Sequence, residues 1–107
     1  MFYSNGIKIV PLDIAKYLTP RALAFWIMDD GSWTGSGLLL HTNSFSESEV
    51  DCLIDALHAN FGFTANKRNR YGKWIIYIPV KDVTLLRSIV FIHMHKSFYY
   101  KIGIKKE

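Results

Sequence analysis

Two adjacent carboxylates, Asp29 and Asp30, stand where a predicted helix ends at Gly31. The partial negative charge of a helix C-terminus disfavours acidic side chains by about 0.3–1 kcal/mol each, so this placement runs against local preference. A hard divalent cation would relieve the conflict, because such ions take oxygen ligands and free backbone carbonyls lie at the same helix end. A simple polar helix stop is the alternative interpretation. The carboxylate pair is therefore a candidate metal site.

The helix that carries these carboxylates has clear local signals. Thr19 is a suitable N-cap residue, and Pro20 follows at the first helical position, where its missing N–H costs nothing. The helix should run from Pro20 to about Asp29 and end at Gly31. A hairpin that turns near residues 35–37 and enters a run of leucines is predicted next.

Further along, the sequence predicts a second helix, a second hairpin and a third helix. Ser46 and Glu49 have the spacing of a capping box, and apolar residues at helical spacing follow them. The other predicted ranges are strands at 61–67 and 73–78, a basic turn at 68–72 between them, a helix at about 82–93 and an aromatic, basic tail at 97–106. The resulting order, αββαββα, indicates an α+β fold.

Length and composition fit one domain spanning residues 1–107. A chain of 107 residues, 50% hydrophobic and 15% aromatic, can bury one core but is too short for two domains. No stretch reaches the roughly 18 apolar residues of a spanning helix, and the N-terminal residues lack a basic region followed by an apolar run. The single Cys52 has no internal disulfide partner, and its apolar neighbours indicate a buried, inert thiol. We therefore expect no membrane insertion, no secretion signal and no targeting peptide.

Charge is distributed unevenly along the chain. The net charge is +4, yet residues 1–55 hold three basic side chains against seven acidic ones, whereas residues 56–106 hold ten basic side chains against Asp82 alone. A strongly basic half of a small domain is typical of a protein that binds a polyanion. A surface that is basic only for solubility would have the same composition, so charge alone does not decide the matter.

The segment 23–31, LAFWIMDDG, resembles the LAGLIDADG motif of homing endonucleases. The residues at the first L and A, the I, the last D and the final G of that motif are Leu23, Ala24, Ile27, Asp30 and Gly31. Four blocks are similar, in kind and order, to the second half of two-motif intron endonucleases encoded in mitochondria: YLTPRALAFWIMDDGSW, LHTNSFSESEV, WIIYIPV and SFYYKIG. The resemblance covers roughly residues 7–103. It implies an αββαββ core with a saddle-shaped, four-stranded antiparallel sheet.

The resemblance also implies roles for individual residues. Asp30 takes the position of the acid that binds divalent metal over the scissile phosphate. Asp29 takes the adjacent position, whose backbone carbonyl is a typical metal contact in that family, so its side chain matters less. Lys101 matches the family's catalytic lysine, although a lysine in a basic tail could equally contact phosphate without entering the chemistry. Asn43 falls where the family places a polar residue that orients water. Mg²⁺, or another divalent ion such as Mn²⁺, would activate a water and stabilise the departing 3′ oxygen.

By the same resemblance, strands of the sheet should lie in the major groove of double-stranded DNA, which is wide enough for a two-stranded ribbon. Half or more of such contacts reach phosphates and only fix position. For the second hairpin, a solvated charged turn is the simpler alternative. The side chains expected to face DNA are Ser32, Trp33, Thr34 and Ser36 of the first hairpin and Lys67, Arg68, Arg70 and Lys73 of the second.

One motif supplies one metal-binding acid, whereas cutting both strands of a duplex requires two active sites. We therefore expect a second LAGLIDADG motif, either from an identical mate in a two-fold dimer or from a separate chain. The similarity to a second half also fits a fragment of a longer protein. Phe25 departs from the motif, which has a glycine there that lets paired helices approach closely. An aromatic residue at this position is usual in second motifs of the mitochondrial group.

Three functions fit these patterns. The first is half of an endonuclease for intron homing; the second is a maturase or assembly factor that binds intron RNA without nuclease activity; the third is an inactive remnant. Asp30 and Lys101 favour the first. His93 and His95 lack a third ligand at suitable spacing and do not predict a zinc site. The resemblance also implies an organellar protein, in the mitochondrial matrix.

Overall fold

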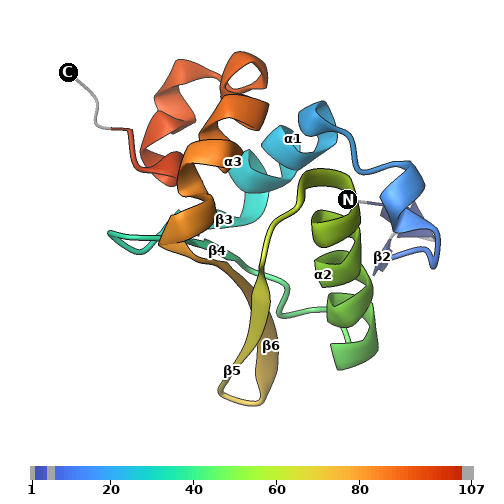
Figure 1. The fold of residues 1–107 in the computed structure, drawn as a ribbon. Helices are drawn as coiled ribbons and strands as arrows, with labels where there is room; N and C mark the ends of the chain where they lie inside the picture. The colour runs from blue at the N-terminus through green and yellow to red at the C-terminus, as the bar shows by residue number, and fades with distance from the viewer. Residues whose placement is uncertain (1, 5–6, 105–107) are drawn as a thin grey trace.

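The structure, a computed structural model, describes residues 2–4 and 7–104. Figure 1 shows the helices gathered beside a twisted sheet, with the hairpin of β5 and β6 projecting away from α1 and α3. In chain order the elements are β1 (Phe2–Ser4), β2 (Ile7–Ile9), η1 (Ile14–Lys16), α1 (Pro20–Asp30), β3 (Gly31–Trp33), β4 (Leu38–Leu40), α2 (Glu47–Phe61), β5 (Asn66–Arg70), β6 (Lys73–Ile78), η2 (Val80–Asp82), α3 (Val83–Val90), η3 (Phe91–His93) and η4 (Lys96–Ile102), where η marks a 3₁₀ helix.

Four strands form one antiparallel sheet in the order β3-β4-β6-β5. The register pairs Leu40 with Gly31 of β3 on one side and with Ile76 of β6 on the other. Strands β5 and β6 pair up to Arg70 and Lys73, leaving a two-residue loop. The α+β class and the four-stranded antiparallel sheet expected from the sequence are confirmed. None of the helices in the described part of the chain is long and apolar enough to cross a membrane.

Helix α1 begins and ends where the sequence predicts. The Thr19 hydroxyl accepts a hydrogen bond from the Ala22 backbone N–H at 3.1 Å, and Pro20 opens the helix. At the other end, the Gly31 N–H donates to the Ile27 carbonyl. A Cβ at position 31 would lie 2.5 Å from that carbonyl oxygen. Glycine is therefore needed there, because only its missing side chain lets the chain pass directly from the helix into β3.

The second hairpin is shifted relative to the prediction. The predicted strand at 61–67 is wrong, because α2 continues to Phe61 and ends at Gly62, whose φ of +77° suits a glycine C-cap. Strand β5 instead runs through most of the predicted turn, so that only Tyr71 and Gly72 remain in the loop. The sequence does not reveal this strand because its residues, NKRNR, show no apolar alternation.

Both ends of the chain contain structure that the sequence does not predict. Strands β1 and β2 form an N-terminal hairpin that pairs Phe2 with Ile9. The helix expected at 82–93 ends as α3 at Val90 and continues as the 3₁₀ helix η3. The tail folds into η4, which contacts β3, α1 and α3.

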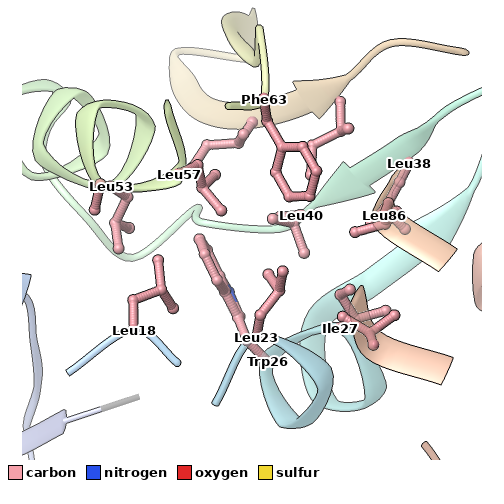
Figure 2. Packing of buried hydrophobic residues seen from close by; sticks show 14 of the residues in the cluster. Leu18, Leu23, Trp26, Ile27, Leu38, Leu40, Leu53, Leu57, Phe63 and Leu86 are labelled. Carbon is pink, nitrogen blue, oxygen red and sulfur yellow. The ribbon is translucent and has the colours of Figure 1, made fainter. Parts of the chain in front are cut away.

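One hydrophobic core lies between the sheet and the helices. Figure 2 shows Leu23, Trp26 and Ile27 of α1 facing Leu40 of β4, with Leu57 of α2 beside them. None of these five side chains is more than 3% exposed. Burying one such side chain contributes about 1.5–3 kcal/mol, so several together hold α1 firmly on the sheet. This packing fixes the position of the acidic end of α1.

Candidate functional site

The two carboxylates lie at the junction of α1 and β3. Asp29 is exposed and Asp30 is half-buried. The His41 backbone N–H donates to the Asp30 carbonyl at 3.0 Å, which extends the pairing of β3 and β4 by one residue. The acidic helix end therefore forms one unit with the first two strands.

Lys101 reaches the same helix end from the opposite end of the chain. Its ammonium donates to the Met28 carbonyl at 2.7 Å, across a separation of 73 residues. The Arg87 guanidinium donates to the Ile102 carbonyl at 2.7 Å and so fastens η4 to α3. A cation at a helix C-terminus is favourable, because it offsets the negative end of the helix dipole. The structure thus brings Lys101 next to the residue that precedes Asp29.

Asn43 lies in the turn that follows β4. The turn is closed by a hydrogen bond from the Phe45 N–H to the Thr42 carbonyl at 3.0 Å, and the Asn43 side chain is exposed. Asn43 follows His41 by two residues, and His41 is bonded to the Asp30 carbonyl. This placement puts Asn43 at the same end of the sheet as the carboxylates.

The donors at this helix end suit a hard cation only in part. Carboxylate oxygens are the right ligand type, and Asp29 and Asp30 supply two such groups. Within residues 2–4 and 7–104, however, no cluster of three or more His, Cys, Asp or Glu side chains could hold a metal ion. Because Mg²⁺ requires six oxygen ligands, an ion bound here would take the remaining ligands from water, from a bound phosphate or from a second protein unit.

The sheet has a covered face and an open face. Cross-strand partners share a face and successive residues alternate, so the register assigns each strand side chain to one face. The covered face carries the core residues packed under the helices. The other face, called the open face below, carries Ser32, Leu39, Asn66, Arg68, Arg70, Lys73, Ile75 and Tyr77. Leu39 and Ile75 on this face are themselves buried, at 6% and 1% exposure, but lie outside the main core cluster.

Four of the residues predicted to contact DNA lie on the open face: Ser32, Arg68, Arg70 and Lys73. Ser36 is exposed in the loop between β3 and β4. The hydroxyl of Thr34 accepts from the Gly37 N–H at 2.9 Å and donates to its carbonyl at 3.1 Å, so this side chain closes that loop.

Trp33 and Lys67 lie on the covered face, contrary to the expectation. The Trp33 ring packs close to Gly103, where an added Cβ would lie 2.5 Å from it, and the Arg87 guanidinium lies 5.6 Å from the ring centroid. Alternation along β3 turns Trp33 toward the helices while Ser32 faces the open side.

The Lys67 ammonium is bound by two acids of α2. It lies 2.6 Å from the Glu47 carboxylate and 2.9 Å from that of Asp51, and 5.3 Å from the centroid of the Trp74 ring. The hydrogen bond to Glu47, followed by the one to Asp51, raises the pKa of Lys67 above its ordinary value. Lys67 therefore fastens the hairpin to α2 rather than extending toward a ligand.

Three residues near the predicted interface were not expected there. Tyr77 and Asn66 are cross-strand partners on the open face, and His41 is exposed beside Asp30. The Arg68 guanidinium lies 3.9 Å from the centroid of the Tyr77 ring. Tyr77 stands between Ile76 and Ile78, so the two-residue alternation of a strand is the sequence signal that could have placed it on the face opposite to theirs.

An apolar groove of about 570 Å³ runs along the side of α1. Phe25 is 51% exposed there, with the Arg21 guanidinium 5.4 Å from its ring centroid. The buried Trp26 indole N–H has no hydrogen-bond partner within the described residues. The groove is lined by Ile14, Tyr17, Leu18, Ala22, Phe25, Trp26, Met28, Asp29 and Phe98.

The chain is similar to known endonucleases and maturases. A model of the LAGLIDADG DNA endonuclease family matches residues 1–86. The intron-encoded endonuclease ai4 of Dictyostelium discoideum is 44% identical over 98% of this chain. The cytochrome b mRNA maturase bI2 of Saccharomyces cerevisiae is 39% identical over 92% of it. The solved structure of the homing endonuclease I-WcaI bound to its DNA recognition sequence matches 98% of the chain with a TM-score of 0.88 and 34% identity.

The matched proteins are longer than this chain. The chain spans 68% of the Dictyostelium endonuclease, 24% of the yeast maturase and 50% of the I-WcaI chain. The fold described above therefore corresponds to half of the DNA-bound endonuclease.

Proposed function

Because the chain belongs to the LAGLIDADG DNA endonuclease family, we propose that it forms one half of a site-specific homing endonuclease that hydrolyses double-stranded DNA with a divalent metal. In this proposal residues 1–107 are one endonuclease unit and α1 is its motif helix. The observation that carries the proposal is the meeting of Asp29, Asp30 and Lys101 at the edge of an open sheet face with three cations. Oxygen ligands for a metal and a basic surface for a polyanion are both needed to cleave DNA.

Asp30, together with Asp29, would hold Mg²⁺ or Mn²⁺ at the end of α1. The ion supplies Lewis-acid stabilisation of the phosphate and an activated water when it is bound. Lys101, held on the Met28 carbonyl, keeps a positive charge near the phosphate, where negative charge develops during cleavage. Asn43 offers an exposed amide at the same end of the sheet for orienting water.

We propose that a second LAGLIDADG unit packs its motif helix into the groove along α1. The half-exposed Phe25 ring supports this occupant, since a second helix would cover it. The incomplete set of metal donors supports it as well. The second unit is either another copy of this chain or a separate chain. The mass of the DNA complex, measured by light scattering, distinguishes the two: the mass of the duplex plus twice the chain mass supports the dimer.

Cleavage tests the proposed function directly. The chain is first used to select bound sequences from a pool of random duplexes in EDTA, and the selected duplexes are then incubated with Mg²⁺. We expect wild type to nick or cut them, and Asp30→Asn to bind equally but cut more slowly by at least about a hundredfold. The neutral amide keeps the shape of the side chain, so equal thermal stability serves as the folding control. Equal cleavage by both proteins would sink the assignment of Asp30.

A second function, RNA binding in intron splicing, is favoured by one observation. Two similar proteins are named cytochrome b mRNA maturases, from yeast and from Debaryomyces hansenii. If the chain binds structured intron RNA more tightly than selected duplex DNA, and Mg²⁺ produces no cleavage, this second function replaces the first. The same names support the proposal that the protein is encoded in mitochondria and stays in the matrix. Subcellular fractionation of the host would test this location.

A further inference from the structure

The hairpin of β5 and β6 ends in an aromatic residue that the open face does not account for. Tyr71 is 98% exposed, so almost nothing in the chain covers its ring. Its φ is +55°, and within the described part of the chain it is the only non-glycine residue with a positive φ. With Gly72 at +77°, the loop between the paired residues Arg70 and Lys73 has the positive φ pair of a type I′ turn.

Both properties of Tyr71 are unfavourable for the isolated chain. Asparagine, aspartate and glycine are preferred at the first position of a type I′ turn because they tolerate the left-handed region, whereas a bulky side chain there is strained. Full exposure also forgoes the stabilisation that burial of an aromatic ring provides. A strained and exposed aromatic residue at a loop tip points to a contact with another molecule.

The surroundings of Tyr71 indicate what that molecule is. Arg70 and Lys73 flank the loop, are exposed and belong to the open face, which continues through Arg68 toward the body of the sheet. Figure 1 shows the hairpin projecting beyond the helices, so its tip is accessible from several sides. A phenol ring between cations suits a nucleic acid, because the ring can contact the edge of a base in the major groove while the cations bind the neighbouring phosphates.

We propose that Tyr71 packs its ring against a base at the outer end of the DNA site and thereby sets the sequence preference there. This inference rests on the proposed function, since it requires the open face to bind duplex DNA. Strand spacings of about 4.8 Å and a rise of about 3.3 Å per residue place the loop roughly 15–20 Å from Asp30. That distance corresponds to about five base pairs of duplex.

Tyr71→Asn is the decisive variant because asparagine is favoured at this turn position. A structural role predicts that the change raises the melting temperature and leaves DNA binding unchanged. We expect instead that the melting temperature rises by a few degrees while the affinity for the selected duplex falls about fivefold to tenfold, as expected when one contact to a base edge is lost. Selection from the random pool should lose its preference about five base pairs from the cut, and keep it elsewhere.

Two controls accompany this variant. Tyr71→Phe keeps the ring and should keep both the affinity and the outer sequence preference. Ile92→Asn removes another exposed apolar side chain, 82% exposed in η3 on the helical side, and should leave DNA binding unchanged.

The outcomes separate this inference from the function on which it rests. If wild type binds no duplex, the proposed function fails whatever Tyr71 does. If wild type binds and Tyr71→Asn binds with equal affinity and equal preference, the inference is overturned and the proposed function stands. A loss of affinity that is uniform along the site and accompanied by a lower melting temperature also overturns it, because it reports a disordered hairpin.

Discussion

Lys67 and Arg68 are neighbours in one strand, yet they are engaged in different ways. Lys67 points to the covered face, where its ammonium is bound by Glu47 and Asp51 of α2. Arg68 points to the open face, where its guanidinium lies over the ring of Tyr77. Lys67 is paired with acids from the acidic half of the chain, whereas Arg68 remains exposed on the surface.

This difference shows that the face of a strand, rather than the number of basic residues, decides which cations are left exposed and so could bind a polyanion. The covered face uses its charge to attach the hairpin to a helix. The open face uses the same kinds of side chain to form a basic surface. The following changes test that division, beginning with the one expected to cost the most free energy.

Leu40→Ala and Leu39→Ala compare the two faces at adjacent positions of β4. Leu40 is fully buried in the core, so its truncation should lower the free energy of unfolding by about 3 kcal/mol. Leu39 is 6% exposed and lies on the open face, outside the main core. Its truncation should therefore lower the free energy of unfolding by less, about 1 kcal/mol. Urea denaturation measures both. Equal losses would show that Leu39 packs on its own face as tightly as Leu40 does in the core.

Lys101→Met should slow cleavage by about tenfold to a hundredfold, because it removes a positive charge near the phosphate. This loss is no larger than that caused by removing one oxyanion-hole donor from an enzyme. DNA affinity should stay the same. Lys96→Met, an exposed lysine in the same 3₁₀ helix, is the matched control. Single-turnover rates with saturating enzyme separate the two effects. A loss confined to affinity would show that Lys101 contacts phosphate without entering the chemistry.

Arg68→Ala combined with Arg70→Ala should weaken DNA binding and flatten its salt dependence, by about 0.9 in slope for each phosphate that is no longer neutralised. The melting temperature should change little because both side chains are exposed. Binding titrations at several salt concentrations measure the slope. Lys81→Ala, an exposed cation outside the sheet, provides the comparison. An unchanged slope would favour the solvated turn.

Lys67→Ala should have the smallest effect, a slight fall in melting temperature that high salt abolishes, with DNA affinity unchanged. Hydrogen bonds to Glu47 and Asp51 raise the Lys67 pKa above 10.5. Its contribution to stability is therefore complete below that pH and is lost only as pH rises through the higher folded-state pKa. Between about pH 6 and pH 9 the difference in melting temperature between Lys67→Ala and wild type should stay constant. Weaker DNA binding by this variant would contradict this prediction and show that Lys67 belongs to the DNA interface.

Sequence reasoning predicted the elements around Asp30 well because each depends on a local signal. Thr19 and Pro20 mark the start of α1, Gly31 marks its end, and the capping box of Ser46 marks the start of α2. In each case the residues that carry the signal are bonded to backbone groups within a few positions of themselves.

The rest depends on contacts between distant residues. Strand β5 is polar on both faces, and its order comes from pairing with β6 and from the bonds of Lys67 to α2. The contact between Lys101 and the Met28 carbonyl spans 73 residues, and only the resemblance to a family implied a role for that lysine. The faces of Trp33 and Lys67 follow from register, which no local pattern specifies.

Gly31 leaves no linker between the motif helix and the sheet, and this has a consequence for target choice. The carboxylates cannot swing independently of the strands proposed to contact the duplex, because the helix passes into β3 at a single residue held against Ile27. The spacing between the scissile bond and the recognised base pairs should therefore be constant. A target with one base pair inserted between them should escape cutting instead of being cut at a shifted position.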